Sequence, residues 1–346
     1  MTGWMLAASA AAGPLIQPGD HVAIVGNTFA DQLRKYGYFE TLLAQECPGI
    51  SVRNLGWAGD TVSLRERPTN FPGEDETLAA HKTDVILLSF GMSEAFAGPA
   101  GIEPFKTDLE KRVHHYKEQR YNTRTPPRLI LVSPIRGQDL GHRTPRFSAQ
   151  VKERALYTLA MKHLAADENI GFMDLFASVL PADQRLTTNG IHLNEAGYRW
   201  ISRRMIGQVF PDQPWQPTGF AGDGLIARDL APGYHALYLD DKRVTTATHE
   251  DWARGMALEL PADPQVEKLR TAIVDKNAQF TFSWKALNQV HIVGERKKSN
   301  SGRALPEEVL AFNQLTLEHE AALQALIPET RIHSWKLLPD PERTLP

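Results

Sequence analysis

The 346-residue chain is long enough for one large domain or two modest ones, and its 42% hydrophobic and 23% charged residues are ordinary for a globular protein. Its formal net charge of −3 gives no electrostatic reason to expect nucleic acid or an anionic membrane surface as a partner. The single cysteine, Cys47, excludes an internal disulfide and any metal site built from several cysteines.

The N-terminal stretch MTGWMLAASAAAG (1–13) is small and apolar but too short to cross a bilayer. It resembles the later part of a secretory signal peptide with an A-x-A cleavage site, although the basic segment that normally precedes such a site is missing. We therefore interpret residues 1–17 as a leader or partial signal peptide and predict export to the periplasm or the cell exterior. A cytoplasmic protein is the alternative, and no other segment approaches the pattern of a membrane span.

Residues 18–212 alternate between short apolar runs and helical patterns. The apolar runs, which predict strands, lie at 21–26, 51–57, 83–91, 127–135 and 170–176. Helical patterns follow at 28–46, 103–118, 146–166 and 195–210. Nearly continuous apolar runs are typical of strands that are buried on both faces. The alternation therefore predicts an α/β fold of the flavodoxin-like kind, a three-layer α/β/α sandwich around a five-stranded parallel sheet.

The last third of the sequence has a different pattern. The segment ALYLDDKRVTT (236–246) alternates around a DDK turn and predicts a small β-hairpin within residues 213–262. Residues 263–346 are predicted to form a helical C-terminal extension, with apolar stripes from Val266 to Leu287 and along 306–327. A charged loop joins the two stripes, and we interpret its short basic run at 296–298 as a solvated surface.

Polar residues and glycines follow several of the predicted strands. In a parallel sheet covered by helices on both faces, ligands bind at the carboxyl ends of the strands. The predicted topology therefore brings Gly26–Thr28, Asn54–Gly59, Gly91–Glu94 and Asn189–His192 to one edge of the sheet.

The loop that carries His192 leads directly into the last helix of this region. Asn194 is a good N-cap, and Glu195 in the first turn suits the positive end of the helix dipole. A histidine in such a loop, close to the ends of other strands, is a credible general base. We therefore expect His192 to belong to a functional site.

Four short blocks at these strand ends resemble the SGNH (GDSL-type) hydrolase family, over about residues 18–210. In that family a nucleophilic Ser follows the first strand in a G-D-S block, and a Gly after the second strand and an Asn in a G-x-N-D block supply oxyanion donors. A D-x-x-H block supplies an Asp and the His base. Here the blocks read Gly26-Asn27-Thr28, Asn54-Leu55-Gly56-Trp57-Ala58-Gly59-Asp60-Thr61, Gly91-Met92-Ser93-Glu94 and Asn189-Gly190-Ile191-His192.

The resemblance implies a hydrolase that acts on ester bonds. It places Thr28 at the nucleophile's position, with Asn27 beside it, and His192 at the base's position. It makes the backbone N–H of Gly59 and the hydroxyl of Ser93 the candidate oxyanion donors. Asn189 stands where the family has the Asp that orients the histidine.

Three of these positions depart from the family's pattern. The β-methyl of Thr28 crowds the approach of the hydroxyl, and Asn189 in place of Asp is a change that costs roughly 10⁴ in turnover in a serine protease by favouring the wrong histidine tautomer. Ser93 reaches less far than Asn, and the loss of one oxyanion donor costs on the order of 10²–10³ in rate. Glu94 and Asp60 are alternative carboxylates for orienting the histidine. The structural alternatives are that Asp60 caps the short segment after the second strand and that Glu94 caps a helix or pairs with an arginine.

A structural interpretation of the first block is also open, because Asn or Thr at a strand-to-helix junction is a common N-cap. We therefore keep two functions. One is an ester hydrolase, for which removal of acetyl groups from a polysaccharide is a candidate activity, and it predicts Thr28 and His192 within hydrogen-bond reach. The other is a degenerate domain that binds a carbohydrate or acyl ligand without turnover. Besides these two functions, a third interpretation is a structural module whose helical tail docks a partner.

The predicted partners are a small-molecule or polysaccharide ester, with no nucleic acid, no cofactor and no metal, and the oligomeric state is left open.

His114 and His115 are neighbours on a predicted helix and therefore do not share a face for a metal pair. The loop GQDLGHR (137–143) follows the fourth strand and brings Asp139 and His142 to the same edge as candidate pocket residues.

A narrower resemblance concerns three segments, at 16–43, 89–98 and 269–288. They look like a lineage of SGNH-type proteins from planctomycetes and their relatives, in which the domain often lies within larger exported proteins. This resemblance implies that the GNT and NGIH blocks are the normal form of that lineage.

Overall fold

The computed structural model describes residues 15–65, 73–211, 220, 224–225, 227, 229–239, 241–258, 262–295, 306–327 and 335–343. Its centre is an all-parallel sheet of five strands in the order β2-β1-β3-β4-β5. The strands are β1 (His21–Gly26), β2 (Ser51–Asn54), β3 (Val85–Ser89), β4 (Arg128–Val132) and β5 (Gly171–Met173). The predicted five-stranded parallel sheet is therefore confirmed.

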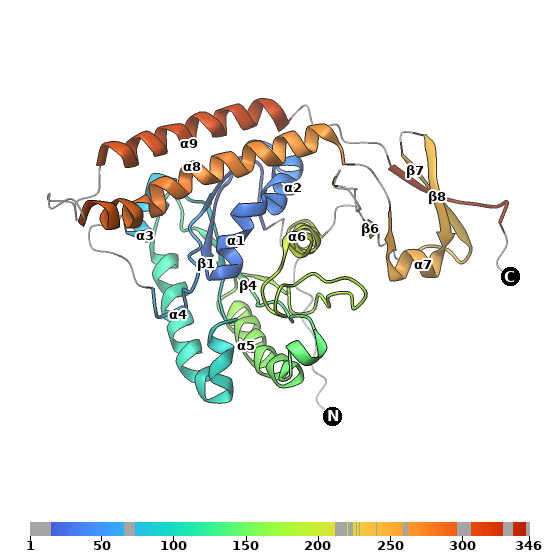
Figure 1. The fold of residues 1–346 in the computed structure, drawn as a ribbon, viewed down its shortest axis with the longest axis horizontal. Coiled ribbons are helices and arrows are strands. Elements are labelled where there is room, and N and C mark those ends of the chain that lie inside the picture. The colour runs from blue at the N-terminus through green and yellow to red at the C-terminus, as the bar shows by residue number, and fades with distance from the viewer. Residues whose placement is uncertain are drawn as a thin grey trace.

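Helices cover both faces of this sheet (Figure 1). One layer contains α1 (Thr28–Tyr36), α2 (Tyr38–Glu46) and α6 (Glu195–Val209), and the other contains α3 (Glu74–Ala80), α4 (Ile102–Glu118) and α5 (Phe147–Asp167). Two short 3₁₀-helices, at Glu94–Gly101 and Gly141–Arg143, follow β3 and β4. The predicted three-layer α/β/α architecture is confirmed.

The alternation of side chains along each strand explains why two separate cores form. On β1, Val22 and Ile24 pack with the layer of α1, α2 and α6, whereas Ala23 and Val25 pack with α3, α4 and α5. All four side chains are buried, since successive residues of a strand point to opposite faces. A sheet covered on both faces therefore needs the continuous apolar runs that the sequence shows.

The segment 28–46, predicted as one helix, is two helices that meet at Gly37. Gly37 adopts the left-handed conformation, with φ of 70°, and its N–H donates to the carbonyl of Leu33 at 3.1 Å. This is the usual way in which a glycine ends a helix. The direction of the chain changes there, and α2 begins at Tyr38.

The predicted hairpin is present and belongs to a small antiparallel sheet. Strands β7 (Tyr234–Leu239) and β8 (Lys242–Thr248) pair with each other, and β10 (Trp335–Pro339) pairs with the other side of β7. Helix α7 (His249–Arg254) and the short strands β6 (Gly224–Leu225) and β9 (Met256–Ala257) lie nearby in sequence. The sequence analysis did not predict β10, which brings residues near the C-terminus back to the hairpin.

The helical extension is a pair of long helices, α8 (Pro264–Glu295) and α9 (Pro306–Leu326). They run side by side along the β2 edge of the sheet (Figure 1). Lys276 donates to the carbonyl of Val52 at 2.9 Å, and Gln324 donates to the carbonyl of Ile50 at 3.2 Å. The helices thereby cover an edge whose unpaired backbone groups would otherwise invite another strand.

Charged side chains also join this helical pair to the sheet. The ammonium group of Lys276 is fully buried and contacts the carboxylate of Glu40 on α2. Arg53 on β2 pairs with Glu320 on α9 at 2.7 Å, and the hydroxyl of Ser51 donates to the same carboxylate at 2.6 Å. We call these five residues the polar seam. Buried charges are tolerated only when they are paired in this way.

Two predictions concern residues outside the described part of the chain. The leader lies at residues 1–17, of which only 15–17 are described, and the basic run at 296–298 is not described. Within the described residues, no helix is both long enough and apolar enough to cross a membrane.

Candidate active site

The first block stands at the end of β1, where the chain turns into α1. A Cβ atom on Gly26 would lie 2.3 Å from the carbonyl oxygen of Ser89, so only glycine allows β1 and β3 to approach this closely. Asn27 is buried and caps α1, because its side-chain oxygen accepts the N–H of Phe29 at 3.0 Å. This cap makes Thr28 the first residue of α1, at the carboxyl end of β1.

The second block is held against the first by the side chain of Asn54. Its amide nitrogen donates to the carbonyl of Ala30 on α1 at 2.7 Å, and its oxygen accepts the N–H of Gly56 at 2.9 Å. The N–H of Trp57 donates to the carbonyl of Gly26 at 2.9 Å. These three bonds fix the loop after β2 beside the start of α1.

Because the loop is fixed there, the N–H of Gly59 donates to the hydroxyl oxygen of Thr28 at 3.3 Å. Gly59 is exposed, and its φ of 90° suits glycine. Ser93 is half-buried after β3, and its hydroxyl has no hydrogen bond to any residue that the structure describes. One candidate oxyanion donor therefore contacts the candidate nucleophile, and the second is free to turn toward a ligand.

Glu94 links two loops of the site. One carboxylate oxygen accepts the N–H of Gly91 and the other accepts the N–H of Val62, both at 2.8 Å. Burial raises the pKa of Glu94 above its ordinary value, although the backbone N–H groups that it accepts act in the opposite direction. Both oxygens are thus committed to holding the loops after β2 and β3 together.

Asp60 is buried, and its carboxylate pairs with the guanidinium of Arg65 at 3.3 Å. The sequence also makes the carboxylates of Asp60 and Glu94 candidates for orienting His192. Among the residues that the structure describes, the His192 ring has no hydrogen bond to either carboxylate. Asp60 instead forms an ion pair with Arg65, where the sequence predicted a cap, and Glu94 accepts two backbone N–H groups.

The loop of the fourth block is shaped by a residue that the sequence analysis did not single out, Gln138. The side-chain oxygen of Gln138 accepts the N–H groups of Leu186 and Thr187 at 3.0 and 3.2 Å, and its nitrogen donates to the carbonyl of Pro181 at 3.0 Å. Its own N–H donates to the carbonyl of Gly190 at 2.8 Å. Only its place in the loop after β4 could have indicated this role.

Asn189 and His192 are both exposed and contact each other within this loop. The side-chain oxygen of Asn189 accepts the N–H groups of His192 at 2.9 Å and Ile191 at 3.3 Å. These two donors orient the amide, so that its nitrogen lies 3.0 Å from Nδ1 of His192. An amide nitrogen can only donate. Nδ1 is therefore the acceptor, and the neutral ring carries its proton on Nε2.

Thr28 and His192 do not bond to each other directly. The hydroxyl of Thr28 accepts from Gly59, the ring of His192 bonds to Asn189, and the described part of the chain contains no Thr28–His192 hydrogen bond. The contact expected for a catalytic pair is absent in this state. Catalytic hydrogen bonds often tighten only when a substrate binds.

The loop after β4 carried two further candidates. Asp139 accepts the N–H of Gly141 at 2.8 Å and the hydroxyl of Thr144 at 3.0 Å, which makes it a turn-forming residue. His142 is exposed in the short 3₁₀-helix of the same loop.

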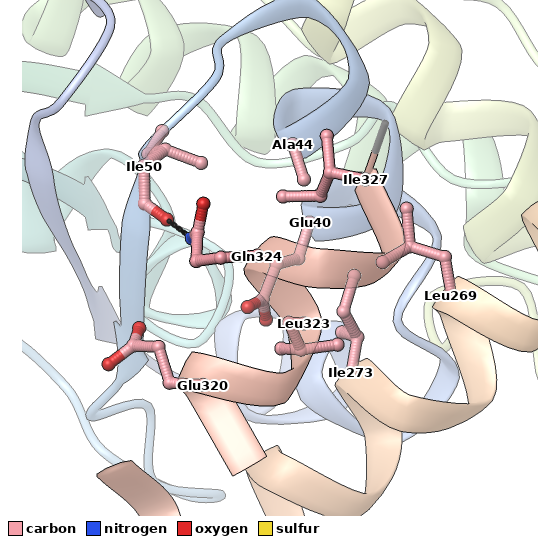
Figure 2. Close-up of a pocket in the computed structure, with 9 residues that line it drawn as sticks. All are labelled: Glu40, Ala44, Ile50, Leu269, Ile273, Glu320, Leu323, Gln324 and Ile327. Carbon is pink, nitrogen blue, oxygen red and sulfur yellow. Dashed lines mark hydrogen bonds between the residues drawn. The ribbon is translucent and has the colours of Figure 1, made fainter. Parts of the chain in front are cut away.

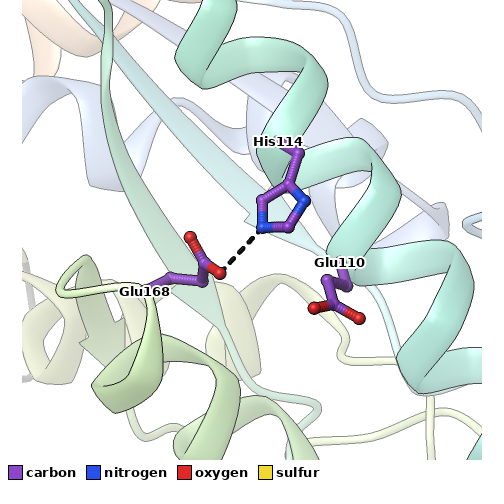
Figure 3. Close-up of side chains that lie close together, drawn as sticks. All are labelled: Glu110, His114 and Glu168. Atoms are coloured by element: carbon purple, nitrogen blue, oxygen red, sulfur yellow. Dashed lines mark hydrogen bonds and ion pairs between the residues drawn. The ribbon is translucent and has the colours of Figure 1, made fainter.

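The neighbouring histidines of α4 face different partners, as expected. His114 lies 2.8 Å from Glu168 and His115 lies 2.9 Å from Asp75. Glu110, His114 and Glu168 together could offer three ligand atoms (Figure 3). Glu168, however, is already bound by Lys117 at 2.7 Å, and the histidine and Glu110 are exposed. This cluster is consistent with an ordinary surface ion pair.

A pocket lies between α2, α8 and α9, at the opposite end of β2 from the site (Figure 2). It encloses about 270 Å³ of empty space, including the part open to solvent. Its two carboxylates, Glu40 and Glu320, belong to the polar seam. The pocket is lined by Glu40, Ala44, Ile50, Leu269, Ile273, Glu320, Leu323, Gln324 and Ile327.

The sequence matches the model of the GDSL-like lipase/acylhydrolase family over residues 19–200. Because the match spans more than half of the chain, the protein belongs to this family. The predicted class, a hydrolase acting on ester bonds, is therefore confirmed at the level of the family. No curated protein matches the sequence.

Solved structures with the same kind of fold include a gut microbial diltiazem-metabolizing enzyme, which is 14% identical with a TM-score of 0.55. That likeness covers 94% of this chain and 98% of the other. An acetylxylan esterase from Geobacillus stearothermophilus is 19% identical, with a TM-score of 0.43 and coverage of 56% and 95%. An aryl esterase from M. smegmatis is 16% identical, with a TM-score of 0.43 and coverage of 56% and 99%.

Proposed function

We propose that this protein hydrolyses ester bonds at a site centred on Thr28 and His192. Family membership supports the reaction class. The observation that carries the site is the 3.3 Å hydrogen bond from the N–H of Gly59 to the hydroxyl of Thr28. A nucleophile and an oxyanion donor must lie together in this way, because the attacked carbonyl has to reach both.

In the proposed reaction the hydroxyl of Thr28 attacks the ester carbonyl or positions a water molecule that does so. The N–H of Gly59 and the hydroxyl of Ser93 stabilise the negative oxygen that develops. His192 takes the proton of the attacking group and returns one to the leaving alcohol, which requires the ring tautomer whose Nε2 carries no proton.

For the substrate we propose an acetyl ester carried on a polysaccharide or a small molecule. Gly59, Asn189 and His192 are all exposed. An open site of this kind suits a short acyl group on a large polymer better than a long acyl chain, which would need an apolar channel to cover it. Export, which would bring the protein to such polymers, is likewise a proposal that depends on the leader sequence alone.

A second candidate function is ligand binding without turnover. Two observations favour it: the amide of Asn189 holds the proton of His192 on Nε2, and Thr28 and His192 share no hydrogen bond in the described residues. A base must have its lone pair, and not its proton, facing the attacking group. A domain arranged in this way could still bind a carbohydrate or acyl ligand while having lost the reaction.

Hydrolysis of a short-chain aryl acetate and of acetylated xylan separates these functions. The purified chain is compared with Thr28→Ala and His192→Ala, and with His163→Ala, an exposed residue of α5, as the control. Turnover that disappears in both site variants would establish an esterase that needs Thr28 in the nucleophile's place together with His192. Turnover lost only in His192→Ala would indicate water activated by the histidine. Equal rates in all four proteins would refute catalysis on these esters and favour the binding function.

A further inference from the structure

Asn189 is followed by Gly190, and this is the one Asn-Gly pair in the whole sequence. Asparagine before glycine is the dipeptide most prone to cyclise and lose ammonia, because glycine has no side chain to hinder attack by its backbone nitrogen. The fold requires that glycine: its φ is 90°, and a Cβ there would lie 2.6 Å from a methyl carbon of Thr144. The reactive pair therefore lies in the loop that carries His192, with Asn189 exposed and Gly190 buried beneath it.

We propose that Asn189 is a modification site whose amide is converted to a carboxylate in the folded protein. We further propose that this conversion changes a weak site into an effective one. The chemical step depends only on the loop, whereas the gain in activity rests on the proposed function.

The reaction needs only water. The backbone nitrogen of Gly190 attacks Cγ of Asn189, a new C–N bond closes a five-membered succinimide, and the bond from Cγ to the amide nitrogen breaks. The proton lost by the Gly190 nitrogen balances the proton gained by the departing ammonia. Water then opens the ring. Attack at Cγ gives aspartate, and attack at the main-chain carbon gives isoaspartate.

The hydrogen bonds of the loop favour the aspartate product. The side-chain oxygen of Asn189 already accepts the N–H groups of Ile191 and His192, which polarise the Cγ carbonyl as an oxyanion hole does. These bonds also fold the side chain back over its own backbone, toward the attacking nitrogen. The N–H of Gly190 donates to the hydroxyl of Thr187 at 3.1 Å, which gives the departing proton an acceptor.

The product would correct the tautomer of His192. A carboxylate at position 189 keeps one oxygen on the two backbone N–H groups and presents its other oxygen, in place of the amide nitrogen, to Nδ1. A carboxylate oxygen only accepts, so the ring proton would move to Nδ1 and leave Nε2 free as a base. The same difference between Asp and Asn is worth about 10⁴ in turnover in a serine protease.

A purely structural role of the pair makes the opposite prediction. Asn189 shapes the loop through its oxygen, and Gly190 is required by its backbone conformation. These roles explain both residues without any reaction. If they are the whole explanation, the rigid loop protects Asn189, and the amide persists.

The test follows the full-length chain as it ages at mildly alkaline pH. Mass spectrometry of the peptide that contains residue 189 measures conversion, and labelling by an isoaspartyl methyltransferase measures the isoaspartate fraction. Asn194, which lies on the same peptide and is followed by glutamate, is the internal control. A urea-unfolded sample shows how fast the unstructured sequence reacts. We expect conversion confined to Asn189 and a larger share of aspartate in the folded sample than in the unfolded one.

Aryl acetate hydrolysis is measured on the same samples. Asn189→Gln keeps the amide but does not readily form the five-membered ring, and Asn189→Asp has the product from the start. We expect the rate of the unmodified chain to rise with its aspartate content, up to about 10⁴-fold, toward that of fresh Asn189→Asp. The rate of Asn189→Gln should stay flat. Thermal melting checks that both variants fold.

Three outcomes would overturn the proposal in whole or in part. An amide that persists in the folded chain while the unfolded chain reacts would refute the modification. If isoaspartate is the main product in the folded chain, the role given to the N–H groups of Ile191 and His192 is refuted. If Asn189 is converted but neither the aged chain nor Asn189→Asp cleaves an ester, the modification stands, and the gain in activity fails together with the proposed function.

Discussion

Ser93 occupies the position at which related blocks have an asparagine, at the end of β3. Its side chain is half-buried, and its hydroxyl is not used by any described neighbour. The adjacent Glu94 holds the backbone of this loop in place, so the direction of the Ser93 side chain is set by a fixed chain. A short side chain on a fixed loop can donate one hydrogen bond, but only to an atom that comes close.

We predict that Ser93→Ala lowers kcat for an aryl acetate by up to about 10²–10³ with little change in KM, because the bond is made mainly to the oxyanion. Ser93→Asn should raise kcat, since the longer amide reaches further. Steady-state kinetics measures both, and Ser148→Ala on the exposed surface of α5 is the control. An unchanged kcat in Ser93→Ala would show that Ser93 does not contact the oxyanion.

At the scale of single elements, the start of α6 positions the histidine loop. Asn194 caps the helix by accepting the N–H of Gly197 at 2.9 Å, and its nitrogen donates to the carbonyl of Arg185 at 2.8 Å. The N–H of Asn194 also donates to the carbonyl of Leu186 at 3.0 Å. One side chain therefore begins the helix and closes the loop that contains His192.

Asn194→Ala should lower the free energy of unfolding by about 1 kcal/mol through loss of the cap. Asn194→Asp keeps an accepting oxygen at the helix start and gains a favourable charge there. Its free energy of unfolding should therefore fall by less than that of Asn194→Ala. Urea denaturation measures both values. If the two variants are equally destabilised, the bond to Arg185, and not the cap, is the important contact of Asn194.

The loops after β2 and β3 are joined by Glu94, and this junction can be tested by Glu94→Gln. The amide retains one accepting oxygen, but its nitrogen faces the second backbone N–H, either that of Gly91 or that of Val62. An unsatisfied buried donor costs about 1–3 kcal/mol. We therefore expect Glu94→Gln to lower the free energy of unfolding by about 1–3 kcal/mol. Urea denaturation measures this change. Glu103→Gln, at a largely exposed position of α4, should be nearly neutral.

At the scale of the whole molecule, the polar seam determines how the C-terminal helices sit on the sheet. Burial alone would raise the pKa of Glu320, but the hydrogen bond and charge of Arg53 outweigh it, so the pKa lies below its ordinary value. His81 is buried beside Ser51, and burial lowers its pKa well below 6.5. The seam therefore needs a charged glutamate next to a neutral histidine.

The pKa shifts of Glu320 and His81 both predict that the free energy of unfolding decreases at low pH. The stabilisation from Glu320 is complete above its unfolded pKa and is lost as the pH falls through its lower folded pKa. His81 stays neutral when folded but binds a proton when unfolded, so stability is lost as the pH falls below about 6.5. We expect the free energy of unfolding, measured in urea across pH, to decrease over this range.

Glu320→Gln should flatten the acid side of this profile and increase hydrogen exchange in α9. Glu318→Gln, an exposed position on the same helix, is the matched control and should leave the profile unchanged. A Glu320→Gln profile that coincides with that of the unmodified chain would mean that Arg53 and Ser51 do not hold the helical pair through this carboxylate.

The sequence alone determined the features that depend on neighbouring residues. Apolar runs marked the five strands, Asn194 marked the start of α6, and the first three polar blocks were placed correctly after β1, β2 and β3. These features are local, since a strand needs apolar side chains in succession and a helix start needs one accepting side chain. The family could be recognised for the same reason, because its blocks are short.

Only the tertiary structure decided which partners these residues have. It split 28–46 at Gly37, paired β10 with β7, and laid α8 and α9 along β2. It committed Glu94 to backbone N–H groups and turned the amide of Asn189 toward His192. Each of these results depends on where separate segments meet or on which of two hydrogen-bonding geometries a side chain adopts. No local pattern of residue types contains that information.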